Sequence, residues 1–278
     1  MFERILYPTD FSEVSLHALK HCIAKMSLLG VKRVYLLHVI DIAVAELEAF
    51  ALEEIYKTKL ENLAKELRER GLDVQTVVRI GIPAIEIAEE AERINADLIA
   101  IPSMGENVWR HMFLGSTVSN LVRATKRPVL ILKYNKKENA FELSVDCSNL
   151  FRRPLVALDF SECSKKIIEV VKNFKEAIEE GILLHSVDYG KIEELEKNIE
   201  TSMRELKRAK KEIGVEFETE VMVGTASQAI IGTALAKRAT LIVVGKKGKG
   251  ILKELILGST ADRVMRDSKI PVLLVPCE

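Results

Sequence analysis

Short apolar runs alternate along the chain with longer segments in which apolar residues recur every three or four positions amid charge. The short runs are typical of buried strands, and the longer periodicity is typical of helices with one buried face. Their alternation predicts β-α-β units, in which helices cover a parallel sheet. The predicted strands are Arg4–Tyr7, Arg33–Ile40, Val74–Arg79, Leu98–Ile101 and Val129–Leu132, then Leu155–Leu158, Ile182–Val187, Phe217–Val223, Leu241–Val244 and Val272–Val275. The predicted helices of the first half are Ser12–Leu29, Ala45–Arg70, Pro83–Ile94 and Ser116–Thr125.

The second half of the chain repeats the first. The segment Asp10-Phe11-Ser12-Glu13 recurs as Asp159-Phe160-Ser161-Glu162, and Leu114-Gly115-Ser116-Thr117 recurs as Leu257-Gly258-Ser259-Thr260. Matches in the same order and at nearly constant spacing indicate a tandem duplication. We therefore predict one domain over 1–135, a linker over 136–150 and a second domain over 151–278, each with five strands and four helices. Residues 140–153 add either an extra strand or a short helix.

Composition and charge exclude several classes of protein. Hydrophobic residues make up 48% and charged residues 29% of the 278 residues, which argues against disorder. Lys and Arg together number 41, as do Asp and Glu, so no overall positive field favours nucleic acid. No apolar stretch approaches the roughly 20 residues that cross a bilayer, and the N-terminus lacks a signal-peptide pattern. We expect a cytoplasmic protein with no membrane and no nucleic-acid partner. The four cysteines form no Cys-x-x-Cys pair, so we expect reduced thiols and no metal site.

The loop after the fourth strand of the second half is a candidate anion site. Gly245-Lys246-Lys247-Gly248 follows that strand, and Gly258-Ser259-Thr260 opens the next predicted helix. Glycine lets the backbone adopt positive φ and approach a ligand closely, and amides at a helix start favour phosphate. Glycine-rich turns and Ser or Thr helix caps are also common without any ligand. Both interpretations stay open on this pattern alone.

The spacing Gly245-x2-Gly248-x9-Gly258-Ser259, with Asp159 closing the first strand, resembles the nucleotide-binding pattern of the universal stress protein family. The resemblance covers nearly the whole chain twice. It implies an α/β fold, with two doubly wound five-stranded parallel-sheet domains of strand order 3-2-1-4-5 in tandem. It implies binding of ATP or AMP, with Mg²⁺ as a companion of ATP. The cofactor-binding residues that it implies are Asp159 and the backbone of Ser186 or Val187 for adenosine, Gly245 and Gly248 for ribose and phosphates, and Gly258, Ser259 and Thr260 for phosphate.

The first half departs from this pattern at one position. Pro102 stands where the second half has Gly245, and proline removes an amide donor and fixes φ. We therefore expect a degenerate nucleotide motif in the first domain and binding mainly in the C-terminal domain. The weaker first-half equivalents of the site residues are Pro8, Thr9, Asp10, Val39, Gly105, Gly115, Ser116 and Thr117.

No arrangement of nucleophile and base accompanies this pattern. Asp10 and Asp159 have no Ser, Cys or His at a spacing typical of nucleophilic catalysis. His38 and His185 are each expected to bond a neighbouring carbonyl rather than a metal. There is no Gly-x-x-x-x-Gly-Lys-Ser/Thr loop. We expect no catalytic residue and at most slow ATP hydrolysis.

The family resemblance implies a regulator or sensor of the stress response that binds adenine nucleotide. In the family the last strand commonly forms dimers, so the two halves could mimic one dimer within the chain, and a homodimer is also allowed. Two alternatives stay open. One is an interaction module that binds no nucleotide, and the other is an ATP-using enzyme of a related α/β superfamily.

Overall fold

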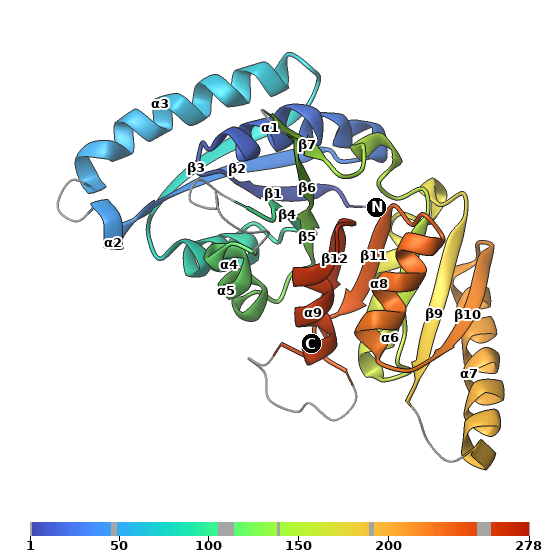
Figure 1. Cartoon of the computed structure of the whole chain (residues 1–278). Helices are drawn as coiled ribbons and strands as arrows, with labels where there is room; N and C mark the ends of the chain where they lie inside the picture. Colours follow the sequence, from blue (N-terminus) through green and yellow to red (C-terminus); the bar gives the residue numbers. More distant parts are fainter. Residues whose placement is uncertain are drawn as a thin grey trace. The chain divides into compact units, whose positions relative to one another are not determined.

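The computed structural model describes residues 2–45, 49–104, 114–137, 140–188, 192–248 and 257–277. The chain divides into two compact units, Met1–Ser148 and Asn149–Glu278. Each unit contains a five-stranded parallel sheet with helices packed against it (Figure 1).

In the first unit the strands lie in the order β3-β2-β1-β4-β5. The order reverses between β1 and β4, so right-handed connections place α1 and α3 on one face of the sheet and α4 and α5 on the other. The strands are β1 (Arg4–Pro8), β2 (Arg33–Asp41), β3 (Asp73–Gly81), β4 (Leu98–Pro102) and β5 (Val129–Leu132). The helices are α1 (Glu13–His21), α2 (Ile42–Ala45), α3 (Ala49–Arg68), α4 (Pro83–Arg93) and α5 (Ser116–Ala124), with a 3-10 helix η1 over Ile23–Leu29.

The second unit repeats this topology, with the strand order β10-β9-β8-β11-β12. Helices α6 and α7 pack against each other, as do α8 and α9. The strands are β8 (Pro154–Ala157), β9 (Gly181–Val187), β10 (Phe217–Val223), β11 (Leu241–Gly245) and β12 (Val272–Val275). The helices are α6 (Glu162–Lys172), α7 (Ile192–Ile213), α8 (Ala226–Ala236) and α9 (Ser259–Asp267), with a 3-10 helix η4 over Lys175–Ala177.

All ten predicted strands are present, and their ends lie within two residues of the predicted ones. The central strands β4 and β11 are buried along nearly their whole length, as their continuous apolar runs predict. The prediction of a doubly wound 3-2-1-4-5 fold is thereby confirmed. The first predicted helix is shorter than expected, because α1 ends at His21 and the chain continues as a 3-10 helix.

The segment expected to be a linker contains regular structure. Strands β6 (Tyr134–Lys137) and β7 (Ala140–Leu143) pair in an antiparallel hairpin, and a 3-10 turn, η3, follows over Cys147–Asn149. Tyr134 is buried, and its hydroxyl lies 3.1 Å from Nδ1 of His17 on α1. This contact could not be predicted from the charged sequence, because a single aromatic ring, that of Tyr134, makes it. The domain limits 1–135 and 151–278 stay predictions.

The expectation of reduced thiols is wrong for this structure. Cys22 pairs with Cys147 in the first unit, and Cys163 pairs with Cys277 in the second. The partners lie 125 and 114 residues apart in the sequence, and the fold brings their Cα atoms to 5.0 and 4.5 Å. Cysteine spacing along the chain carries no sign of such distant pairs. Each disulfide therefore follows from the topology of its own unit.

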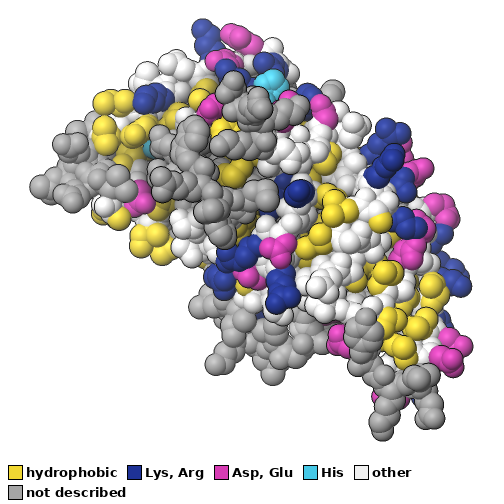
Figure 2. All heavy atoms as spheres, viewed as in Figure 1, with side chains coloured by type: hydrophobic (Ala, Val, Ile, Leu, Met, Phe, Trp, Pro, Cys, Tyr) yellow, Lys and Arg dark blue, Asp and Glu magenta, His cyan; other side chains and the backbone are white. Residues whose placement is uncertain are grey.

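The surface carries both signs of charge. On the face drawn in Figure 2, basic and acidic side chains of the described residues are interspersed rather than gathered by sign. Many of them form exposed ion pairs, such as Lys57 with Glu53 on α3, which contribute little stability each. Among the described residues, no helix combines the length and the apolar character needed to cross a bilayer.

Candidate functional site

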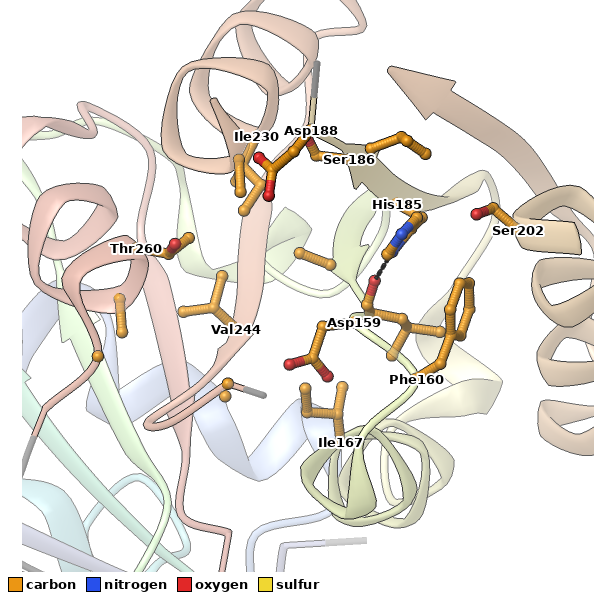
Figure 3. A pocket seen from close by; sticks show the side chains of 18 of the residues that line it. Asp159, Phe160, Ile167, His185, Ser186, Asp188, Ser202, Ile230, Val244 and Thr260 are labelled. Atoms are coloured by element: carbon orange, nitrogen blue, oxygen red, sulfur yellow. Dashed lines mark hydrogen bonds between the residues drawn. The ribbon is translucent and has the colours of Figure 1, made fainter. Parts of the chain in front are cut away.

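A large cavity of the second unit lies at the carboxyl ends of its central strands, where the strand order reverses. Its volume is about 690 Å³, within the usual size of small-molecule sites. All eight residues predicted for the second half line it: Asp159, Ser186, Val187, Gly245, Gly248, Gly258, Ser259 and Thr260. Figure 3 shows three of them, Asp159, Ser186 and Thr260. The structure thus gathers in one cavity residues that are spread over a hundred positions of sequence.

Asp159 follows β8 and is held in one orientation by hydrogen bonds. Its Oδ1 accepts from the amide and hydroxyl of Ser161 at 3.0 and 2.5 Å and from the hydroxyl of Ser164 at 2.9 Å. Both serines belong to the start of α6, so the helix cap orients the carboxylate. A Cβ placed on Gly248 would lie 3.1 Å from the other oxygen, Oδ2. The carboxylate therefore borders the loop after β11.

Phe160, next to Asp159, has an unusual backbone conformation. Its φ is 59°, in the left-handed region that few non-glycine residues adopt, and Phe11 in the first unit has a φ of 60°. This turn directs the Phe160 ring to His185 on β9, where the ring centroids lie 4.4 Å apart. The two neighbours Asp159 and Phe160 thus line different parts of the cavity.

The strand-end histidines behave as predicted. Nδ1 of His185 donates to the carbonyl oxygen of Leu158 at 2.6 Å, and Nδ1 of His38 donates to that of Thr9 at 2.8 Å. Within the described residues, no group of three His, Cys, Asp or Glu side chains is placed to hold a metal ion.

Glycine is required at the end of β11 for close packing, and the expectation of positive φ is wrong for Gly245 and Gly248. Gly245 and Gly248 lie outside the left-handed region. A Cβ on Gly245 would come within 2.5 Å of Sγ of Cys163 and 3.1 Å of the Lys247 carbonyl oxygen. Gly245 therefore makes room for the Cys163–Cys277 disulfide. The amide of Lys247 donates to Sγ of Cys277 at 3.3 Å, which ties the loop to the same disulfide.

Helix α9 begins at the cavity. Its N-cap is Gly258, which has no side chain with which to cap the first turn. The amide of Gly258 donates to the carbonyl oxygen of Lys246 at 2.9 Å, which closes the loop at its base. The first amides of a helix have no partner within the helix and carry its positive dipole end. Ser259 and Thr260 thus offer an anion-binding helix start to the cavity.

Several lining residues were not predicted from the sequence. Most of them lie on helices that begin or pass beside the strand ends, and no local motif marks them. They are Ile167 on α6, Asn198, Thr201 and Ser202 on α7, Ala226 and Ile230 on α8, and Asp188 after β9. Phe160, His185 and Lys247 also line the cavity; Lys247 belongs to the predicted anion loop, and the other two lie in the repeated segment and on a strand without having been assigned to a ligand. The rule that ligands bind beyond strand ends would have indicated the first turn of α8.

The first unit has a smaller cavity at the equivalent place, with a volume of about 340 Å³. It is lined by seven predicted residues: Pro8, Thr9, Asp10, Val39, Gly115, Ser116 and Thr117. Gly105, also predicted, lies outside the described residues. Pro102 also lines the cavity and pairs with Leu132, as Gly245 pairs with Val275, so the predicted equivalence of the two positions is confirmed.

His38 makes the stability of the first unit depend on pH. Burial lowers the pKa of His38 below its usual 6.5, against smaller raising effects of the Thr9 carbonyl and Asp10; Lys59 lowers it further. As pH falls through 6.5, the unfolded histidine takes up its proton before the folded one, so acid favours unfolding. We expect urea unfolding to show lower stability at pH 5.0 than at 7.5. The difference in the free energy of unfolding between the two pH values should be smaller in His38→Asn. An equal difference in the variant and the wild type would contradict the role of His38.

The arrangement defines a class of protein: a doubly wound α/β fold with a cavity at the switch point of each sheet, bordered by a helix start. The chain belongs to the universal stress protein family, whose model matches residues 1–133 and again residues 150–276.

The chain is similar to several proteins of known sequence or structure. Universal stress protein MJ0577 of Methanocaldococcus jannaschii is 36% identical over 156 residues, which cover 48% of this chain and 96% of that protein. A crystal structure of a universal stress protein from Archaeoglobus fulgidus covers 98% of this chain and 96% of its own, with a TM-score of 0.73 and 26% identity. A universal stress protein solved in complex with cAMP is 25% identical and covers 46% of this chain and 98% of its own, with a TM-score of 0.38.

Proposed function

We propose that this universal stress protein binds an adenine nucleotide, ATP or AMP, mainly in its second domain, and acts as a regulator or sensor in the stress response. One observation carries the proposal. A single cavity gathers a fixed carboxylate, Asp159, a loop that comes close to it at Gly248, and a helix start at Ser259 whose N-cap is a glycine. The carboxylate suits a ribose hydroxyl, the close loop suits the ribose ring, and the helix start suits a phosphate.

The polarity of the cavity supports this orientation of the ligand. Asp159 follows β8 with its Oδ1 held by Ser161 and Ser164, so the carboxylate stays an acceptor that suits a ribose hydroxyl. The phosphates would lie across the cavity, at the amides that open α9, with Lys247 also lining the cavity. Ala226 and Ile230 of α8 provide an apolar wall for the base. Conformational change of the loop between Gly245 and Gly258 would then carry the signal to a partner.

The two cavities support unequal binding. The cavity of the second domain has about twice the volume of the first, about 690 against about 340 Å³. Pro102 lines the smaller one and has no amide hydrogen to donate. We therefore propose that the domain over 151–278 holds the nucleotide and that the domain over 1–135 binds it weakly. Hydrolysis should be slow at most, because the sequence has no nucleophile and base at a spacing typical of nucleophilic catalysis.

Calorimetric titration of the full chain with ATP, AMP and GTP tests the proposal. We expect one tight adenine-nucleotide site per chain, with GTP weaker. Mass spectrometry of the ligand released from purified protein should find an adenine nucleotide. Two equal tight sites would refute the asymmetry. Failure of all three nucleotides to bind would refute the proposal and favour an interaction module.

The substitution Asp159→Ala should weaken binding of adenosine as well as ATP. A charged hydrogen bond contributes about 1.5–3 kcal/mol, so we expect at least about a 10-fold loss of affinity. Asp10→Ala is the matched control, because Asp10 has the same bonds to Ser12 in the first domain. Calorimetric titration should show a lower affinity for adenosine and ATP in Asp159→Ala than in Asp10→Ala. A loss confined to ATP, or an equal loss in both variants, would contradict the role of Asp159.

A further inference from the structure

Helix α1 carries two histidines, His17 and His21, that take no part in the proposed nucleotide site. Four residues make slightly more than one helical turn, so the two side chains lie on one face of the helix. Their rings stack, with centroids 4.2 Å apart and planes inclined by 27°. His17 is partly buried and His21 is exposed, so the pair is open to solvent on the side of His21.

The hairpin β6-β7 orients the inner ring of this pair. Nδ1 of His17 lies 3.1 Å from the hydroxyl of Tyr134, and the two rings meet nearly edge to face, at 79°. Burial raises the pKa of Tyr134, so the phenol keeps its proton. A phenol oxygen can accept a hydrogen bond as well as donate one. When Nδ1 of His17 carries the proton and donates it to this oxygen, the lone pair of Nε2 is available to a ligand.

Two acidic side chains act on His17 from different elements. Glu13 lies four residues before it on α1, and Glu142 lies on β7. Burial lowers the pKa of His17 below its usual 6.5, and His21 lowers it further, against smaller raising effects of the two carboxylates. The imidazole of His17 is therefore neutral at pH 7, which is the form that binds a metal ion. The negative charge of the carboxylates favours a cation at the same place.

We infer that His17 and His21 bind a divalent transition-metal ion of the kind that prefers imidazole, such as Zn²⁺. Histidines at positions i and i+4 of a helix are spaced to share such an ion. Two imidazoles on one ion have ring centres about 4.5–5 Å apart, because each metal–nitrogen distance is about 2.0–2.1 Å. The observed separation of 4.2 Å is close to this, and a rotation of the exposed His21 ring brings its nitrogen toward the ion. Among the described residues no group of three His, Cys, Asp or Glu is placed to share an ion, so water completes the coordination.

The second unit does not repeat this pair. Lys166 and Val170 stand at the positions equivalent to His17 and His21, by the offset of the repeated Asp-Phe-Ser-Glu segments. A lysine is protonated at neutral pH and repels a cation, and a valine offers no ligand atom. The inference goes beyond the proposed nucleotide binding and does not rest on it, because neither histidine lines the cavity of its unit.

Calorimetric titration of the full chain with Zn²⁺ at pH 7.5, without nucleotide and without reductant, tests the site. These conditions keep ATP from chelating the ion and keep the cysteines in their disulfides. We expect one ion per chain with a dissociation constant on the order of 10 µM, weaker than a four-ligand zinc site. His21→Asn leaves one imidazole and should weaken the binding at least about 10-fold. His38→Asn is the matched control and should not change it, because Nδ1 of His38 is bonded to the Thr9 carbonyl oxygen in a buried place.

Two further measurements locate the ion. Zn²⁺ should shift the NMR signal of Nε2 of His17 rather than that of Nδ1, which faces Tyr134. Binding should be lost at pH 5.0, because protons compete for the same nitrogens. The inference would be overturned if the wild type bound no Zn²⁺ below about 1 mM, or if His21→Asn and His38→Asn, both folded by their melting curves, bound it equally. Absence of ATP binding would refute the proposed function alone.

Discussion

Replacing Gly248 by valine should lower the affinity for ATP about 100-fold, which corresponds to about 2.7 kcal/mol. A Cβ at this position would lie 3.1 Å from Oδ2 of Asp159, and the branched side chain extends further. Either the carboxylate or the loop must then move away from the cleft. Both border the proposed ribose position, so either movement removes contacts to the ligand. Calorimetric titration of the purified variant measures the loss.

The control for this variant is Gly232→Val. Gly232 lies on α8, and a Cβ there meets no atom within 4 Å, so the same change should leave ATP affinity as in the wild type. The ATP affinity of Gly248→Ala should lie between those of Gly248→Val and Gly232→Val. Wild-type affinity in Gly248→Val, with the protein folded, would show that the loop after β11 does not contact the nucleotide.

Removing the disulfide of the second unit should destabilise that unit by about 2–4 kcal/mol. Cys163 and Cys277 close a loop that spans 114 residues, so the bond restricts most of the unfolded chain of this unit. The double variant Cys163→Ser/Cys277→Ser should unfold at lower urea concentration than the oxidised wild type. Nucleotide affinity should fall as well, because the amide of Lys247 donates to Sγ of Cys277.

Cys22→Ser/Cys147→Ser is the matched control, because it removes the other disulfide from the first unit. It should lower stability without lowering the affinity for ATP. Wild-type protein treated with dithiothreitol should behave as if both pairs were replaced. Four free thiols in protein purified without reductant, or unchanged unfolding of the Cys163→Ser/Cys277→Ser variant, would contradict the disulfide assignment.

The fold could be predicted because its signals are local and occur twice. Each strand is a short apolar run, and the repeated Asp-Phe-Ser-Glu segments mark the same turn after β1 and β8. Parallel strands put their carboxyl ends at one edge of the sheet, so residues that follow strands meet there. That rule is sufficient to bring Asp159, Gly245 and Ser259 into one cavity.

Features that depend on distant side chains could not be predicted. The cysteine pairs are more than a hundred residues apart, and the hairpin β6-β7 is anchored by one buried ring, Tyr134. Positive φ was expected at glycines of the loop after β11, whereas it occurs at Phe11 and Phe160. Nothing local distinguishes such a phenylalanine from an ordinary turn residue, because the surrounding hydrogen bonds determine its conformation.

Each disulfide begins and ends inside its own unit. Cys22 and Cys147 nearly bracket the first unit, and Cys163 and Cys277 nearly bracket the second. A protease cut between Cys147 and Cys163 would therefore give two bands on a denaturing gel without reductant, and each fragment would keep its own disulfide. A cut between the two cysteines of one disulfide would leave a single band until reductant is added. The covalent closure of this duplicated chain is thus modular, because each of the two disulfides lies within one unit.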